Sequence, residues 1–188
     1  TASLASDFRQ RVNTVVESLR NARLETGHKT LYFANLAAPQ EQLHEQLDFL
    51  VEAGADGVLL SPTLLGLDNV RSLIEGHPQL LAMAHPTMSG LFYQDPAHGI
   101  AHDILFGQLY RLLGMDLSTY PNSGGRFAFE AHDCQAVAKQ LLEPMGEYKA
   151  CFPVLAGGMN KELIPYMARD FGEDAVYLIG GALLAHSS

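Results

Sequence analysis

Two glycine pairs near the C-terminal end of the chain, Gly157-Gly158 and Gly180-Gly181, have the residue type and spacing of a phosphate-binding site. Each pair closes a short apolar run, and one helix-length segment, residues 160–171, separates them. Because glycine has no Cβ atom, its backbone N–H group can approach phosphate oxygens closely. In α/β barrels the loops after the last two strands commonly bind phosphate in this way. The spacing therefore predicts a bound phosphate, with two tight turns that hold no ligand as the alternative.

His85 is the side chain that could carry proton chemistry. It directly follows the apolar run 80–84, and in α/β barrels the chemistry takes place at the C-terminal ends of the strands. A histidine at such a position can act as acid, base or hydrogen-bond donor, or it can merely cap the neighbouring helix or loop. Asn35 follows the apolar run 30–34 in the same way and either binds the substrate or fixes its own loop.

The other histidines have weaker claims to function. His98 and His102 are four residues apart, which suits a metal pair on a helix, but no third ligand is evident, so a structural role is favoured. Four further histidines are expected to be exposed to solvent in turns or on polar faces: His28, His44, His77 and His132.

The composition excludes several classes of protein. A length of 188 residues is typical of one domain, and a net charge of −9 with scattered basic residues argues against nucleic acid or an anionic membrane surface as partner. No apolar run reaches the ~18 residues of a membrane span, and no signal peptide is evident. Cys134 and Cys151 lack CxxC spacing, so a reduced, cytoplasmic setting is expected.

Helical and strand-like segments alternate along the whole chain. The apolar periodicity and the glycine stops predict helices at 4–24, 40–53, 67–75, 99–113, 134–142 and 160–171. Short continuous apolar runs predict strands at 30–34, 57–60, 80–84, 116–120, 151–156 and 175–179. Short apolar strands between helices are typical of parallel strands covered on both faces, which indicates an α/β fold.

The count of elements favours an incomplete (β/α)₈ TIM barrel. The pattern has six strands and six helices, begins on a helix and ends on a strand, whereas a complete barrel has eight strands and typically ~250 residues. We therefore expect about strands three to eight of a barrel, with parallel strands. An open doubly wound sheet is the alternative, but the first strand-to-helix turn lacks the G-x-G-x-x-G motif of many such folds.

Several motifs in a fixed order resemble the C-terminal barrel of the RuBisCO large-chain superfamily. The matching stretches are KTLYFAN (29–35), AHP (84–86), PNSGGRF (121–127), AGG (156–158) and FGEDAV (171–176), followed by Gly180-Gly181. The resemblance runs from about residue 27 to 188. It implies one domain over 1–188, truncated on its N-terminal side, with the N-terminal domain and the first two barrel strands absent.

Two departures indicate a RuBisCO-like protein of the form IV type, not a true carboxylase. In carboxylases an arginine that binds a substrate phosphate follows this histidine, and here Pro86 follows His85. Carboxylases also carry a lysine that orients CO₂ on the loop after strand six, and here that loop has Arg126 but no lysine. Arginine does not replace the compact charge of lysine. The arginine that binds one substrate phosphate is missing, whereas both glycine pairs are retained. This also suggests a substrate with one phosphate.

The resemblance implies chemistry that starts with proton abstraction next to a carbonyl. In the family, Mg²⁺ held by a Lys-x-Asp-Glu motif stabilises the enolate, and the N-terminal domain of a partner subunit completes the site. That motif is absent here, so Mg²⁺ ligands are expected upstream, no metal ligand is assigned in this chain, and a homodimer is expected. The residues carried over are His85 as catalytic residue, and Asn35, Ser123 and the four glycines Gly157, Gly158, Gly180 and Gly181 as substrate contacts.

The implied function is part of an enzyme that enolises, isomerises or decarboxylates a phosphorylated ketose or diketose. The sequence does not choose among these reactions. Three alternatives remain: a non-catalytic fragment that only binds phosphate, a true ribulose-bisphosphate carboxylase, and another phosphate-binding barrel. For the chain by itself, absence of activity is the expectation.

Overall fold

Six parallel strands form one sheet in the computed structural model, which describes residues 7–95, 97–124 and 129–185. The strands are β1 (Phe33–Asn35), β2 (Gly57–Leu60), β3 (Leu81–Ala84), β4 (Leu117–Pro121), β5 (Phe152–Ala156) and β6 (Val176–Tyr177). Each strand pairs with the next one along the chain, in the order β1 to β6. Among the described residues β1 and β6 do not pair with each other, so the sheet is an open half-barrel. The expected α/β fold and incomplete barrel are confirmed.

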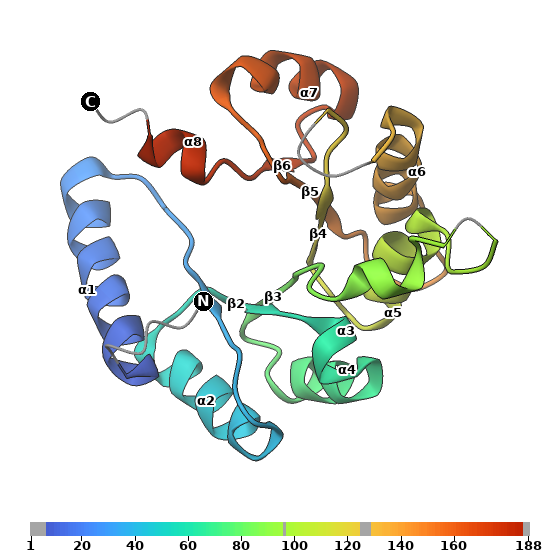
Figure 1. Ribbon diagram of the computed structural model, residues 1–188. Helices are drawn as coiled ribbons and strands as arrows, with labels where there is room; N and C mark the ends of the chain where they lie inside the picture. The colour runs from blue at the N-terminus through green and yellow to red at the C-terminus, as the bar shows by residue number, and fades with distance from the viewer. Residues whose placement is uncertain (1–6, 96, 125–128, 186–188) are drawn as a thin grey trace.

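The helices surround the strands on the outside, as Figure 1 shows with the strands near the centre of the view. The α-helices are α1 (Phe8–Thr26), α2 (Gln40–Ala53), α3 (Pro62–Leu65), α4 (Leu67–Gly76), α5 (Tyr110–Leu112), α6 (Ala131–Leu142), α7 (Ile164–Phe171) and α8 (Gly181–Leu184). Three further segments are the 3₁₀ helix η1 (Ser89–Phe92), the π-helical η2 (Asp103–Leu109) and the 3₁₀ helix η3 (Lys161–Leu163). None of the described helices is both long and apolar enough to cross a membrane.

Three expectations about the elements were wrong. The described chain ends on helix α8, not on a strand, and it has more helical segments than six. The strands expected at 30–34 and 175–179 are shorter, because only Phe33–Asn35 and Val176–Tyr177 find a partner strand. The helix expected at 99–113 starts at Asp103, because the N–H of Ile100 donates to the carbonyl of Phe92 at 2.7 Å and keeps this stretch in a loop.

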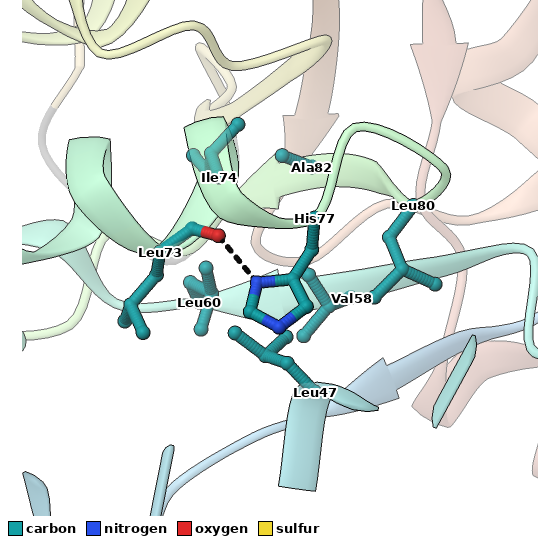
Figure 2. Close-up of a pocket in the computed structure, with 8 residues that line it drawn as sticks. All are labelled: Leu47, Val58, Leu60, Leu73, Ile74, His77, Leu80 and Ala82. Carbon is teal, nitrogen blue, oxygen red and sulfur yellow. Dashed lines mark hydrogen bonds between the residues drawn. The ribbon is translucent and has the colours of Figure 1, made fainter. Parts of the chain in front are cut away.

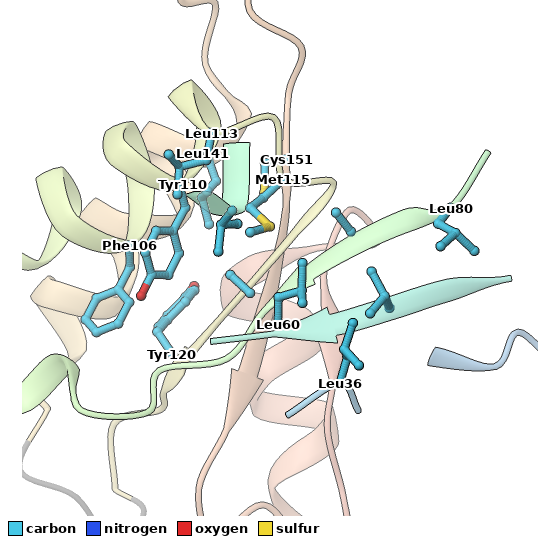
Figure 3. Packing of buried hydrophobic residues seen from close by; sticks show 14 of the residues in the cluster. Leu36, Leu60, Leu80, Phe106, Tyr110, Leu113, Met115, Tyr120, Leu141 and Cys151 are labelled. Carbon is cyan, nitrogen blue, oxygen red and sulfur yellow. The ribbon is translucent and has the colours of Figure 1, made fainter. Parts of the chain in front are cut away.

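Alternation along the strands divides their side chains between two environments. Outward-facing residues such as Leu60 and Tyr120 pack with the helices in the main core, together with Phe106, Tyr110 and Leu141 in Figure 3. Inward-facing residues form a second, smaller cluster around the barrel axis: Met83, Leu117 and Val154, with Phe33 and Leu59 packed against them. Since side chains alternate along a strand, any residue two positions from a member of the inner cluster also faces the axis.

Charged groups hold the N-terminal edge of the sheet. Asp56 accepts hydrogen bonds from the N–H of Tyr32 at 2.8 Å and from the Arg23 guanidinium at 2.6 Å. Asp116 accepts from the N–H of Ala82 at 2.8 Å and from the Lys149 ammonium group at 2.6 Å. In barrels this edge serves stability, whereas the opposite edge carries the chemistry.

The open half-barrel is expected to self-associate. Inward-facing Leu81 and Phe152 are 37 % and 48 % exposed, and the outer edges of β1 and β6 carry no partner strand among the described residues. Exposed apolar faces and unpaired edges bind other chains. Light scattering after size exclusion should show species larger than a monomer, and Phe152→Lys should reduce them more than Leu24→Lys, which changes an exposed leucine of α1. A monodisperse monomer of the unmodified chain would contradict this prediction.

Candidate functional site

The predicted site residues lie at one edge of the sheet. Because all six strands are parallel neighbours, their C-terminal ends meet at the same edge. Asn35 is the last residue of β1, His85 directly follows β3, and Ser123 follows β4. Gly157-Gly158 follows β5, and Gly180-Gly181 lies at the start of α8, after β6. The fold therefore positions every predicted residue where barrels carry their chemistry.

Both glycine pairs line a single cavity of about 420 Å³. Its lining consists of Gly157, Gly158, Met159, Asn160, Leu178, Gly180, Gly181 and Ala182. Gly157 and Gly158 have φ angles of 88° and 91°, in the left-handed region that only glycine adopts easily, so they are required by the turn itself.

At Gly180 and Gly181 the backbone conformation does not require glycine, in contrast to Gly157 and Gly158. Neither Gly180 nor Gly181 has a positive φ angle, and a Cβ atom added to either would meet no protein atom within 4 Å. Protein packing therefore does not demand glycine at these two positions. A ligand in the cavity would demand it, because the missing Cβ lets the backbone approach phosphate oxygens.

His85 is held by its backbone and by one ring nitrogen. Its N–H donates to the carbonyl of Leu60 at 2.7 Å, and its Nδ1 lies 2.6 Å from the hydroxyl of Thr87. The residue stays exposed, yet partial burial of the imidazole lowers the pKa of His85 below its ordinary value. Since His85 lies two positions beyond inward-facing Met83, its side chain faces the barrel axis.

The structure does not bring all the predicted residues together. Asn35, His85 and Ser123 are not among the residues that line the glycine cavity. Asn35 lies two positions beyond Phe33 and faces the axis, as His85 does. Ser123 instead lies within hydrogen-bonding reach of the Cys134 thiol, whose pKa burial raises to about 11. Arg126 belongs to the loop that carries a lysine in carboxylases, and it lies outside the described residues.

Two buried polar residues, Thr119 and Asn122, lie at the same edge of the sheet without having been expected as site residues. Thr119 of β4 is 2 % exposed, faces the axis two positions beyond Leu117, and its hydroxyl has no hydrogen-bond partner. Asn122 is fully buried, and its amide nitrogen lies 3.0 Å from the sulfur of Met159, while its amide oxygen has no partner. Buried polar groups normally find partners, so these two are candidates for ligand contacts. For Thr119 the available signal was its polar side chain within a strand, and for Asn122 its position directly after that strand.

His77 is buried, not solvated, which corrects the expectation for this histidine. Figure 2 shows it among Leu47, Val58, Leu73 and Leu80, and its Nδ1 lies 2.7 Å from the carbonyl oxygen of Leu73. The cavity beside it measures about 10 Å³, less than a ligand needs. His77 therefore anchors the end of α4 against the sheet and does not form a binding site.

His98 and His102 contact different carboxylates. Nδ1 of His102 lies 3.2 Å from a carboxylate oxygen of Asp133, whereas His98 lies 3.6 Å from Asp95. Among the described residues no group of three or more histidine, cysteine, aspartate or glutamate side chains could hold a metal ion. The Mg²⁺ of the resembled family therefore does not fit any cluster in the described part of the chain.

Comparison with known proteins decides the family. The catalytic domain of the ribulose bisphosphate carboxylase large chain matches residues 4–188. The chain belongs to the RuBisCO large-chain family. Its relatives include RuBisCO-like proteins, as expected for the form IV type.

Three relatives show how far the similarity extends. A 5-methylthioribulose-1-phosphate isomerase from Rhodospirillum rubrum is 37 % identical over 94 % of this chain and 46 % of its own length. A 2,3-diketo-5-methylthiopentyl-1-phosphate enolase from Bacillus cereus is 35 % identical over 94 % and 43 %. The crystal structure of a Rubisco-like protein from Rhodopseudomonas palustris superimposes with a TM-score of 0.87 at 33 % identity, over 94 % of this chain and 49 % of its own. The chain thus spans about half the length of the relatives it matches.

Proposed function

We propose that this chain is the C-terminal barrel part of a RuBisCO-like enzyme that enolises, isomerises or decarboxylates a phosphorylated ketose or diketose. The observation that carries the proposal is the single cavity of about 420 Å³ lined by both glycine pairs. Two relatives named as an isomerase and an enolase of 1-phosphates support the same substrate class. Residues 1–188 would then form one domain that the rest of the enzyme completes.

The described residues fit separate tasks at the sheet edge. The backbone N–H groups around Gly157-Gly158 and Gly180-Gly181 would bind the phosphate. His85 would act on the carbonyl end of the substrate, and Asn35 would contact a substrate hydroxyl from the same axis-facing side of the sheet. Ser123 remains a weaker candidate, since it lies beside Cys134.

The proposed enzyme needs a metal ion whose ligands are not among the described residues of this chain. Mg²⁺ would stabilise the enolate and would be held by ligands upstream, because no described cluster can hold it. A homodimer, which the family resemblance implies, and a cytoplasmic setting, which Cys134 and Cys151 favour, complete the proposal.

Proton exchange tests the function directly. The complete enzyme, incubated with Mg²⁺ in D₂O, should exchange the proton next to the carbonyl of a phosphorylated ketose or diketose, which NMR detects as loss of one proton resonance. We expect sugars with one phosphate to bind more tightly than bisphosphates. No exchange across a panel of such sugars would overturn the enzymatic proposal, and a clear preference for bisphosphates would overturn the single-phosphate assignment.

A second candidate function is phosphate binding without catalysis by the chain alone. The missing metal cluster among the described residues favours it for the isolated chain. The isolated chain should then bind a sugar monophosphate but show no proton exchange, whereas exchange by the isolated chain would exclude this alternative.

Gly181→Ala is expected to weaken phosphate binding without weakening the fold. The added methyl group would meet no protein atom within 4 Å, and alanine at the first position of the four-residue helix α8 should leave the stability of the protein nearly unchanged. In the cavity the same methyl group would keep phosphate oxygens away from the backbone, so affinity for a sugar monophosphate should fall about tenfold or more, or ~1.4 kcal/mol. Isothermal titration measures both proteins.

Gly76→Ala is the matched control for this variant. Gly76 ends α4, has no atom within 4 Å of an added Cβ, and does not line the cavity. It should leave phosphate affinity unchanged. If the unmodified protein and Gly181→Ala bind the sugar monophosphate with equal affinity, Gly180-Gly181 does not bind the phosphate.

A further inference from the structure

The loop after β3 is fixed at several points around His85. The N–H and the hydroxyl of Ser89 both donate to the carbonyl of Pro86, at 3.2 and 2.7 Å. The hydroxyl of Thr63, at the start of α3, donates to the carbonyl of Thr87. Met88 has a φ angle of 62°, the only positive φ of a residue other than glycine in the described part of the chain. Such a strained conformation persists where the surroundings determine it, so this loop is a rigid support.

These anchors do not depend on the side chain of Thr87. They use backbone groups of Pro86 and Thr87 and the hydroxyls of Thr63 and Ser89. The Thr87 hydroxyl has a separate task, because it lies 2.6 Å from Nδ1 of His85. Removal of this hydroxyl therefore changes the environment of the imidazole and leaves the loop anchored.

Either partner of this contact could donate, because a hydroxyl both donates and accepts and the role of a histidine ring nitrogen depends on the tautomer. Hydrogen bonds with a hydroxyl donor are typically ~2.7–2.8 Å long, whereas N–H donors lie ~2.9–3.0 Å from oxygen. At 2.6 Å the contact fits a Thr87 hydroxyl that donates to an unprotonated Nδ1. A neutral imidazole with an unprotonated Nδ1 carries its proton on Nε2.

We propose that Thr87 is a positioning residue that holds His85 as the neutral tautomer with its proton on Nε2, so that His85 meets the substrate as a hydrogen-bond donor. The proposal rests on the proposed function, in which His85 faces the carbonyl end of the substrate. A neutral Nε2–H group polarises a carbonyl or stabilises an enolate oxygen, but it cannot remove a proton from carbon. The base that enolises the substrate must then be a group other than His85.

The ionisation of His85 agrees with this role. Partial burial lowers its pKa, which keeps the ring neutral at neutral pH. The charged residues of the described ion pairs lie elsewhere: Asp56 and Asp116 hold the opposite edge of the sheet, and Asp133 lies on α6 beside His102. Thr63, Thr87 and Leu60, whose atoms bond to the His85 loop, are all uncharged.

The tautomer can be measured without any substrate. In ¹⁵N NMR of ring-labelled protein, an unprotonated imidazole nitrogen resonates at much higher frequency than a protonated one. We expect the unprotonated resonance for Nδ1 of His85 in the unmodified protein and in Thr87→Ser, and a mixture of both tautomers in Thr87→Val. Thr14→Val is the matched control, because it removes a hydroxyl on the exposed face of α1. A proton on Nδ1 in the unmodified protein, or an unchanged spectrum of Thr87→Val, would overturn the proposal.

Kinetics of the complete enzyme give the second readout. Thr87→Val should lower kcat about 10–100-fold, the usual effect of losing a group that orients a catalytic side chain, with little change in KM. Thr87→Ser should restore most of kcat, because it retains the hydroxyl. Equal kcat for Thr87→Val and the unmodified enzyme would contradict the positioning role. An enzyme without exchange activity would overturn the proposed function alone, since the NMR spectrum decides the tautomer independently.

Discussion

Arg111→Met should lower the free energy of unfolding by about 3–5 kcal/mol, because four backbone carbonyls lose a charged donor and each hydrogen bond to a charged group contributes ~1.5–3 kcal/mol. Arg111 is only 2 % exposed, and its guanidinium donates to backbone carbonyls alone. It bonds the carbonyls of Gln140 and Glu143 at 2.7 Å, of Lys149 at 3.0 Å and of Tyr148 at 3.1 Å. Methionine fills the space but leaves these acceptors without a donor.

The position of these carbonyls explains why a cation is stable there. Gln140 and Glu143 lie at the C-terminal end of α6, where helical carbonyls lack partners and the helix dipole is negative. Tyr148 and Lys149 precede β5, so one side chain joins η2–α5, α6 and the sheet. Urea denaturation measures the change, with Arg20→Met on the exposed face of α1 as control. A loss below about 1 kcal/mol would contradict this account. Lysine should not rescue the fold, because its donors cannot span four acceptors.

His85→Ala should lower turnover of the complete enzyme by about 10²–10⁴-fold, the usual contribution of a positioned acid–base or donor group. Binding of the phosphate should change little, because His85 does not line the glycine cavity. His85→Asn should retain part of the activity, since an amide can donate a hydrogen bond to the same oxygen. His132→Asn is the control, because the side chain of His132 is 81 % exposed. Full turnover by His85→Ala would remove this residue from the mechanism.

The lowered pKa of His85 also sets a pH dependence. Protonation of Nδ1 would break its hydrogen bond from the Thr87 hydroxyl and place a positive charge on the ring, so activity should persist below the ordinary histidine pKa of ~6.5 and change only as the pH drops through the lowered value. Because the pKa of His85 is lower in the folded protein, the unfolded chain binds a proton at His85 more readily. The contribution of His85 to stability is therefore fully present above pH ~6.5 and declines as the pH falls through the lowered pKa. A pH–rate profile in which kcat already falls above pH 6.5 would contradict a lowered pKa of His85.

Local patterns predicted the fold class and the sheet edge at which the candidate residues lie, because they do not depend on contacts between distant residues. The glycine pairs, the His-Pro step after the third strand and the parallel order of the strands all follow from neighbouring residues and from the handedness of the connections. His77 shows the limit of such patterns. A histidine in a turn-like stretch looks solvated, and only the packing of α2 and α4 on the sheet buries it.

The amino-acid sequence by itself determined the family, the α/β architecture and the edge of the sheet that carries the candidate site, because periodicity and motif order are local properties of the chain. Only the tertiary structure decided which side chains meet. It placed both glycine pairs on one cavity, separated His85 from that cavity, and brought the Thr87 hydroxyl onto the imidazole. The physical reason is that strand register and loop anchoring arise from hydrogen bonds between segments 20 or more residues apart, such as Thr63 to Thr87, which no local pattern specifies.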